Sequence, residues 1–321
     1  SAYHSRPMAD LGIITNPTAG RNRSRIERVR AWTEATGALS REVADLDSIV
    51  AATRDLLATG VDVLAVNGGD GTAQAVLTLL AGFDGDWPDV ALLPGGTTNM
   101  SANDINGTSR LMKSLKRLAE QAALPAEKRS RVMRPLLRVS AAGLADQYGF
   151  CASAGVVLRG MRHFREFVGA RGLRGELATG ISVFRGLAGV ARNSGGWSDT
   201  PPVTVTIADS EETWTDQILV VATSLDRLML GFTPWWGEGD GPLHLFALAR
   251  GPQGLIRQAP SMLRGRPNPG LTPERGYRSA EVTGVRLEGV DGFALDGEIL
   301  PVGEDGALTV AATPPVSLLA L

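Results

Sequence analysis

The sequence predicts an α/β N-terminal domain with a three-layer, mainly parallel sheet, followed by a mostly antiparallel, β-rich C-terminal domain. Apolar strand-like runs alternate with helix-compatible segments in the first part of the chain, which is typical of a parallel sheet covered by helices. From about Arg134 onward, short strand-like runs follow one another, separated by Gly, Pro, Asp and Ser. The expected domains are residues 1–130 and 131–313, with a tail, residues 314–321, that can return to the first domain.

The composition narrows the classes of function. A formal net charge of −2 gives no overall attraction to nucleic acid, so no nucleic-acid partner is expected. The single cysteine, Cys151, excludes an intrachain disulfide framework and fits a reducing cytoplasm, and we expect it to be a buried structural thiol. No apolar run approaches the length of a membrane span. The expected location is therefore the cytoplasm.

The first expected elements lead into a glycine-bearing turn. A short apolar strand at residues 11–15 is followed by NPTAG, residues 16–20, and then by a basic segment of helical character. A second strand near residues 40–44 precedes a helix at about residues 46–57. This order is the start of an alternating strand and helix pattern.

The stretch VDVLAVNGGDGT, residues 61–72, contains the strongest motif. An apolar, β-branched run ends in a glycine turn and a helix-compatible segment follows at once, which predicts a buried strand and a helix N-terminus. Glycines let the backbone approach a ligand, and the N–H groups of the opening helix favour an anion. Asp70 within this turn suits a divalent cation that accompanies a nucleotide polyphosphate. The alternative is an ordinary turn that uses Asp and Gly for shape.

A third glycine-bearing turn follows the next strand. The strand is expected at residues 90–93, the turn is PGGTTN at residues 94–99, and a helix at residues 110–121 follows. Ligands collect at the carboxyl ends of parallel strands, and all three glycine-bearing turns occupy such ends. We therefore expect the three turns to form one site.

The second domain contains strand-like runs and one arginine-rich segment. The runs are residues 134–140, 146–153, 203–208, 217–224, 243–249, 281–288 and 307–312. Residues 159–192 are helical in character and combine seven arginines with phenylalanines. Such a segment can bind anionic lipid headgroups, which predicts peripheral contact with the inner face of the membrane. A solvated helix face is the alternative.

The turns NPTAG, GGDGT and PGGTTN, together with a late DGE at residues 296–298, resemble the catalytic domain shared by diacylglycerol kinases, sphingosine kinases and bacterial lipid kinases. GGDGT also occurs in NAD kinases and resembles the phosphofructokinase loop, whereas the proline-led GTxN turn favours the lipid-kinase branch. The resemblance covers nearly the whole chain, because this family pairs an α/β nucleotide domain with a β-rich domain. It implies ATP, Mg²⁺ and a lipid substrate.

The resemblance also implies three sets of site residues. The nucleotide-binding set is Asn16, Gly20, Asn67, Gly68, Gly69, Asp70, Gly71, Thr72, Gly96, Thr97 and Asn99. The catalytic set is Glu298, Asp70 and Asp296, with Glu298 as the general base on the acceptor hydroxyl. The metal set is Glu238, Asp240 and the carbonyl of Leu243, which resemble a structural Mg²⁺ site of bacterial relatives; a plain acidic turn is the alternative. Met100 departs from the family, which often has Asp at that position, and Asp104 is a candidate substitute.

The segment FALDGEIL, residues 293–300, suits phosphoryl transfer on physical grounds as well. This reaction needs cradled phosphates, a metal and an oriented acceptor hydroxyl. An apolar strand delivers two carboxylates around a glycine turn, so Asp296 can hold a position or a metal while Glu298 accepts the hydroxyl proton. An Asp-Gly β-turn with a solvated Glu is the alternative.

The sequence is therefore interpreted as an ATP-dependent lipid kinase, a phosphotransferase with an alcohol group as acceptor. Two rival interpretations remain open. One is an NAD-kinase-like soluble nucleotide kinase, and the other is a catalytically silent lipid- or nucleotide-binding module. Family analogy makes a homodimer a reasonable expectation.

Overall fold

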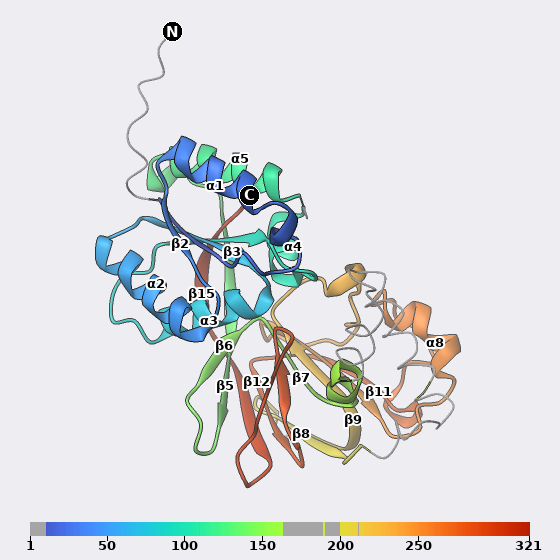
Figure 1. The fold of residues 1–321 in the computed structure, drawn as a ribbon. Coiled ribbons are helices and arrows are strands. Elements are labelled where there is room, and N and C mark those ends of the chain that lie inside the picture. The colour runs from blue at the N-terminus through green and yellow to red at the C-terminus, as the bar shows by residue number, and fades with distance from the viewer. Residues whose placement is uncertain (1–10, 109, 163–188, 190–199, 211) are drawn as a thin grey trace. The chain divides into compact units, whose positions relative to one another are not determined.

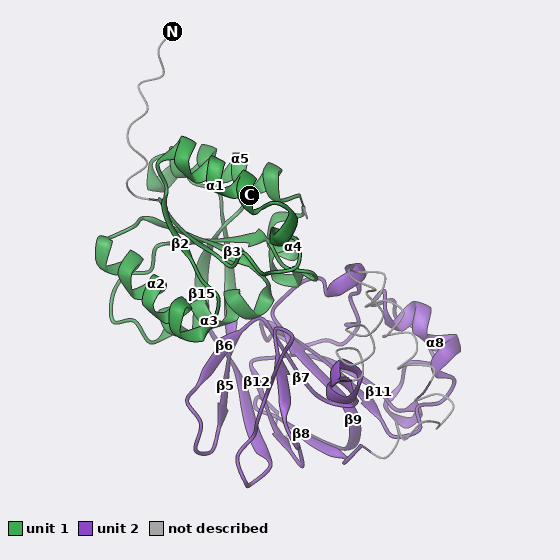
Figure 2. Cartoon of the chain, in the orientation of Figure 1, with its two compact units in different colours: residues 1–134, 315–321 green, residues 135–314 purple. Residues whose placement is uncertain are grey.

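The computed structural model describes residues 11–108, 110–162, 189, 200–210 and 212–321. The chain divides into two compact units, coloured green and purple in Figure 2. Unit 1 comprises Ser1–Arg134 and Pro315–Leu321, and unit 2 comprises Pro135–Pro314. Within the described residues, no helix is both long enough and apolar enough to span a lipid bilayer.

Unit 1 contains a parallel sheet flanked by helices (Figure 1). Its strands are β1 (Leu11–Thr15), β2 (Leu39–Glu42), β3 (Val63–Gly68), β4 (Asp89–Pro94) and the end of β15 (Ala307–Leu319). They lie in the order β2-β1-β3-β4-β15 and all pair in parallel. The helices are α1 (Ile26–Thr36), α2 (Leu46–Thr59), α3 (Asp70–Ala81), α4 (Met100–Asn106) and α5 (Leu111–Ala122), with short 3-10 turns η1 (Asn22–Ser24) and η2 (Ala126–Lys128).

Side chains of these strands alternate between the two faces of the sheet, as the strand period of two requires. Leu11 and Ile13 of β1 join the core that contains Val29 of α1 and Leu115 of α5. Gly12, between them, faces Leu56 of α2. Thus α1 and α5 cover one face, and α2 and α3, which contact each other, cover the opposite face (Figure 1). The predicted three-layer α/β architecture is confirmed.

The beginnings of the helices in unit 1 differ in how well local sequence determines them. Helix α2 has a local capping box, in which Asp45 and Ser48 exchange hydrogen bonds, and it begins where the sequence predicts. Helix α1 begins only at Ile26, after the 3-10 turn η1, although the basic segment predicts a helix directly after Gly20. Helix α4 was not predicted at all.

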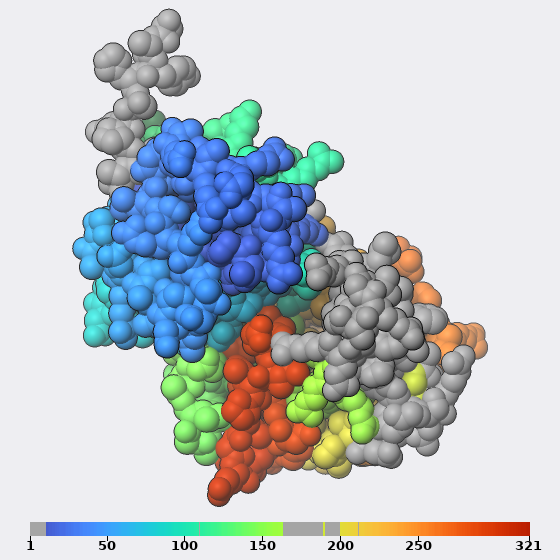
Figure 3. All heavy atoms as spheres, in the orientation of Figure 1, coloured from blue at the N-terminus to red at the C-terminus, as the bar shows by residue number. Residues whose placement is uncertain are grey.

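On the face that Figure 3 shows, blue atoms from the N-terminal part of the chain form most of the surface of unit 1.

Unit 2 is built from antiparallel strands, as predicted. They are β5 (Arg131–Ala141), β6 (Gln147–Gly149), β7 (Cys151–Gly155), β8 (Val203–Ile207), β9 (Thr213–Thr223), β10 (Leu243–Ala249), β11 (Tyr277–Val282), β12 (Gly284–Glu288), β13 (Phe293–Leu295), β14 (Glu298–Leu300) and the first part of β15. The central strand is β9, which pairs with β7, β8 and β10. Further elements are helix α8 (Leu255–Met262) and the 3-10 turns η4 (Met229–Gly231) and η5 (Pro273–Arg275).

Two predictions for unit 2 need comment. Cys151 is half-buried on β7 rather than fully buried, and it forms no disulfide. Most of the arginine- and phenylalanine-rich segment, residues 159–192, lies outside the described residues. The membrane contact inferred from that segment therefore stays a prediction.

Candidate functional site

Three turns meet at one edge of the parallel sheet of unit 1. We define turn 1 as residues 16–22, after β1; turn 2 as residues 67–72, from the last two residues of β3 to the start of α3; and turn 3 as residues 94–99, from the last residue of β4 onward. Because β1, β3 and β4 are neighbours and parallel, their carboxyl ends lie together. The backbone N–H of Asn16 donates to the carbonyl of Asn67 at 2.9 Å, which ties turn 1 to turn 2.

Glycines allow these turns to approach each other at backbone distance. A Cβ atom on Gly96 would overlap the Cα of Gly69, and a Cβ on Gly20 would overlap the Thr97 hydroxyl. A Cβ on Gly68 would lie 2.6 Å from the Cβ of Thr72. No larger residue fits at these three positions without a shift of the chain, so the glycines serve close packing.

Two asparagines fix the shapes of turns 1 and 3. The Asn16 side-chain oxygen accepts from the Thr18 backbone N–H at 3.0 Å and the Thr18 hydroxyl at 2.8 Å, which makes an Asx turn. Asn99 adopts the left-handed conformation with φ of 52°, which Asn tolerates. Its amide exchanges two hydrogen bonds with the backbone of Gly96, at 2.6 and 2.8 Å. Both side chains therefore stabilise backbone geometry.

The N-terminus of α3 lies within turn 2. Its N-cap is Gly69, which offers no side-chain acceptor, so no side chain caps the first N–H groups of this helix. Among the described residues, the backbone N–H groups of Asp70 and Gly71 have no acceptor in the protein. Uncapped N–H groups and the helix dipole together favour an anion at this point.

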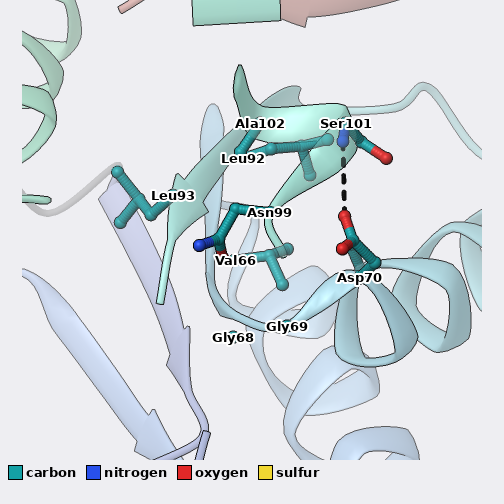
Figure 4. Close-up of a pocket in the computed structure, with 10 residues that line it drawn as sticks. Val66, Gly68, Gly69, Asp70, Leu92, Leu93, Asn99, Ser101 and Ala102 are labelled. Carbon is teal, nitrogen blue, oxygen red and sulfur yellow. Dashed lines mark hydrogen bonds between the residues drawn. The ribbon is translucent and has the colours of Figure 1, made fainter. Parts of the chain in front are cut away.

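Asp70 connects turn 2 to the start of α4. Its carboxylate oxygens accept from the backbone N–H groups of Met100, at 3.2 Å, and Ser101, at 3.3 Å, and Figure 4 shows the second of these hydrogen bonds. Burial raises the pKa of Asp70, and these two hydrogen bonds offset only part of that effect. Asp70 thus caps α4, and the sequence did not predict this structural role. Its predicted contact with a metal would be a separate role.

A small pocket lies beside Asp70 and has room for about one water molecule, ≈ 10 Å³ (Figure 4). It suits a water or a single ion rather than a nucleotide. The residues that line it are Val66, Gly68, Gly69, Asp70, Ala73, Leu92, Leu93, Asn99, Ser101 and Ala102. Asp104, the candidate substitute for the missing family Asp, instead forms an ion pair with Arg134 at 3.3 Å, and its side chain is 2% exposed.

The predicted carboxylates of unit 2 lie on the β13–β14 hairpin. Asp296 and Gly297 have φ of 47° and 86°, which makes a two-residue turn of type I′. The buried Asp296 carboxylate accepts from the backbone N–H of Phe150 at 3.0 Å and of Cys151 at 2.9 Å. Asp296 therefore anchors the hairpin to β7, whereas Glu298, at the start of β14, is exposed. Asp296 thus holds the hairpin in place, and a catalytic role for it stays a prediction.

The predicted metal set lies beside β10 and β11. Glu238 and Asp240 are exposed, and Leu243 is a buried residue that pairs with Val282. In the part of the chain that the structure describes, no three His, Cys, Asp or Glu side chains are grouped to hold a metal. The predicted set contributes only two such side chains, the carboxylates of Glu238 and Asp240, and its third ligand is a carbonyl. The metal site therefore stays a prediction.

The sequence did not indicate Asn22, which is fully buried between the turns. The segment after Gly20 was interpreted as a basic helix, and an isolated Asn in such a segment carries no local signal. Its contacts are long-range in the sequence, reaching Asn67 and Gly95.

Comparisons with known proteins agree with this geometry. Residues 10–129 match the family model described as "Diacylglycerol kinase catalytic domain". This match confirms the resemblance predicted from the sequence. No curated protein matches the chain.

Solved structures similar to this chain share its fold over nearly the full length. One is the crystal structure of a diacylglycerol kinase from Bacillus anthracis str. Sterne, with a TM-score of 0.62 and 16% identity over 98% of this chain and 97% of that chain. Another, described as a candidate diacylglycerol kinase from the same organism, has a TM-score of 0.66 and 15% identity over 98% of this chain and 97% of that chain. At these identities the likeness establishes the two-domain fold alone.

Proposed function

Starting from the match of residues 10–129 to the diacylglycerol kinase catalytic domain, we propose that this protein is an ATP-dependent kinase that transfers the γ-phosphate to a lipid hydroxyl. The observation that carries the proposal is the meeting of three glycine-bearing turns at the carboxyl ends of β1, β3 and β4. Such an edge, with the uncapped N-terminus of α3 beside it, suits the phosphates of a nucleotide.

In this proposal the residues of unit 1 bind and orient the nucleotide. The N–H groups of Asp70 and Gly71 donate to phosphate oxygens, and Gly69 and Gly96 let the backbone come close to them. Asn16 and Asn99 hold turns 1 and 3 in shape. Phosphoryl transfer depends mainly on such positioning, because the protein contributes little covalent chemistry.

The residues present also fit a magnesium ion. Each oxygen of the Asp70 carboxylate accepts one backbone N–H and keeps a further lone pair, and Mg²⁺ is commonly held by one or two carboxylates together with substrate phosphates. When bound, the ion would neutralise charge on the transferring phosphate. The adjacent pocket is of the right size for one metal-bound water.

Glu298 is proposed as the general base on the acceptor hydroxyl. It is exposed at the first position of β14, and the Asp296-Gly297 turn, held to β7, fixes the strand that carries it. General-base catalysis contributes roughly 10²–10⁴ in rate. Asp296 then acts through the hairpin rather than on the substrate.

The site of action is proposed to be the cytoplasm, with peripheral contact at the inner face of the membrane, where a lipid acceptor is available. A homodimer and the structural Mg²⁺ site at Glu238, Asp240 and Leu243 remain proposals that rest on family resemblance. An NAD-kinase-like activity is the second candidate function. The GGDGT sequence of turn 2 favours it, because that sequence is shared with NAD kinases.

The test is transfer of label from γ-³²P-ATP with Mg²⁺ to a mixed bacterial lipid extract, with NAD in a parallel reaction. We expect a labelled lipid with the wild type and a loss of about 10²–10⁴-fold in turnover with Glu298→Gln, while nucleotide binding is retained. Glu304→Gln is the matched control, because Glu304 is also exposed and lies outside the hairpin turn.

The alternative outcomes are equally informative. Label in NADP would identify a soluble-nucleotide kinase. Tight ATP binding with no labelled product in either reaction would favour the catalytically silent module. Wild-type turnover in Glu298→Gln would eliminate Glu298 as the base.

A further inference from the structure

Asn22 joins all three turns through its side-chain amide and its backbone. It is not one of the predicted site residues. It follows Gly20 in turn 1 and begins η1, and its side chain is 0% exposed. Its side-chain nitrogen donates to the carbonyl of Asn16 at 2.8 Å and to the carbonyl of Asn67 at 3.0 Å. These two hydrogen bonds connect turn 1 to the end of β3 through one side chain.

The backbone of the same residue reaches the third turn. The N–H groups of Arg21 and Asn22 both donate to the carbonyl of Gly95, at 3.0 and 3.1 Å. Gly95 also provides the space for the amide, because a Cβ at that position would lie 2.6 Å from the Asn22 side-chain nitrogen. Asn22 thus contacts turns 2 and 3 at once, with glycine required on the facing side.

The two halves of the Asn22 amide are used unequally. The nitrogen donates both of its protons, whereas the oxygen is buried without a hydrogen-bond partner in the described part of the chain. Both acceptors of the nitrogen are main-chain carbonyls: that of Asn16, the first residue of turn 1, and that of Asn67, near the end of β3. The donor function is therefore the part of the side chain that holds the turns together.

We propose that Asn22 is a positioning residue for the nucleotide, which sets the mutual distance of the three turns without touching the substrate. The proposal rests on the proposed function, since it assigns a role within that site. Losing the two hydrogen bonds that tie turn 1 to β3 should weaken ATP binding by about 10- to 100-fold, even though the carbonyls of Asn16 and Asn67 each keep one backbone donor. The turnover number and the KM for the lipid should change by less than about threefold, because neither depends directly on Asn22.

The experiment compares Asn22→Ala and Asn22→Leu with Asn106→Ala. Leu has nearly the same shape as Asn but neither a donor nor a charge, so it removes the donor function while most of the packing is kept. Asn106 is a matched control in the same unit: it is 8% exposed, donates to the carbonyl of Leu92 at 2.7 Å and accepts from the N–H of Leu321. Neither hydrogen bond reaches one of the three turns, so its loss should lower stability without raising the KM for ATP.

Two readouts are needed. The first is the KM for ATP, the KM for lipid and kcat of each variant. The second is amide hydrogen exchange of Arg21 and Asn22, whose N–H groups donate to Gly95. We expect the Asn22 variants to raise the KM for ATP selectively and to speed exchange at these two amides, and we expect Asn106→Ala to do neither.

The inference is overturned if the Asn22 variants match Asn106→Ala in both the KM for ATP and the exchange rates. If Asn22→Ala does not fold, the nearly isosteric Asn22→Leu decides. If the wild type transfers phosphate to no acceptor, the proposed function fails, and the exchange rates alone then decide whether Asn22 joins the turns.

Discussion

Each end of strand β4 has an aspartate associated with it, and the two carboxylates are satisfied in different ways. Asp89, at the start of the strand, is 8% exposed and accepts from Arg131 at 2.6 and 2.8 Å and from Arg129 at 3.1 Å. Asp70, beside the turn that follows the strand, accepts from two backbone N–H groups of α4. Among the described residues, no Lys or Arg forms an ion pair with Asp70.

The two carboxyl groups consequently titrate in opposite directions. Burial acts to raise the pKa of both. At Asp89 the guanidinium groups of Arg131 and Arg129 outweigh burial and lower the pKa. At Asp70 no such countercharge acts, and the pKa is raised. The comparison teaches that Asp89 is a completed structural ion pair, whereas Asp70 faces no countercharge among the described residues, which is compatible with the metal contact proposed for it.

The largest expected effect is a loss of activity when Asp70, beside the turn that follows β4, is replaced. Asp70→Asn keeps one acceptor for the N–H groups of α4 but removes the negative charge. We expect turnover with MgATP to fall by about 100-fold, because the carboxylate proposed to hold the metal is lost. Stability should change by less than about 1 kcal/mol, since the charge that is removed was costly to bury. Steady-state kinetics and urea unfolding measure both. Normal kinetics in this variant would contradict the metal role of Asp70.

The next largest expected effect is a loss of stability when Asp89, at the start of β4, is replaced. Asp89→Asn leaves two arginines facing a neutral side chain, and breaking a buried ion pair typically costs about 3–5 kcal/mol. Because Arg131 is partly exposed, we expect about 3 kcal/mol of lost unfolding free energy. The activity of the folded fraction should stay at the wild-type level. A loss of activity without a loss of stability would reverse the comparison between the two ends.

Gly96→Ala tests whether the turns near Asp70 need their close approach. The added Cβ would overlap Gly69, so turn 3 must move away from turn 2. We expect MgATP affinity to fall by about tenfold or more, measured by titration calorimetry. The control is Gly82→Ala, where φ is −95° and the nearest atom, the carbonyl oxygen of Leu79, lies 3.7 Å from the new Cβ. Equal affinities in the two variants would rule out close packing as a requirement for binding.

The contrast between the two ends also shows what could be predicted from sequence. Strands β1 to β4, the glycine turns and their convergence depend on local patterns and on the parallel order, and all were predicted. Helix α4 was missed because its cap comes from Asp70, which lies thirty residues before Met100. Asn22 was missed for the same reason, since its partners lie in other turns. Asp296 was predicted as a catalytic residue, but only the structure revealed its backbone partners on β7.

Acid titration should separate the two ends by the sign of the effect. The folded-state pKa of Asp89 is lowered, so its stabilisation is present above its unfolded pKa of about 3.9 and is lost as the pH falls through the folded-state value. The stability gap between the wild type and Asp89→Asn should therefore close in acid. The folded-state pKa of Asp70 is raised, so ionisation costs stability as the pH rises above about 3.9. The unfolding free energy of Asp70→Asn should consequently rise relative to that of the wild type from acid to neutral pH, as measured by urea unfolding across this range.

The smallest expected effect concerns Ser317, whose hydroxyl donates to the Asp89 carboxylate at 3.1 Å. This bond joins the returning β15 segment to β4, next to the single pairing of Leu318 with Val90. Ser317→Ala should cost about 1 kcal/mol of unfolding free energy, because the arginines still satisfy the carboxylate. In an Asp89→Asn background the same substitution should cost less, since the hydrogen bond to a charged acceptor is already gone. Equal costs in both backgrounds would mean that Ser317 acts independently of Asp89 and that the arginines alone complete this end of the strand.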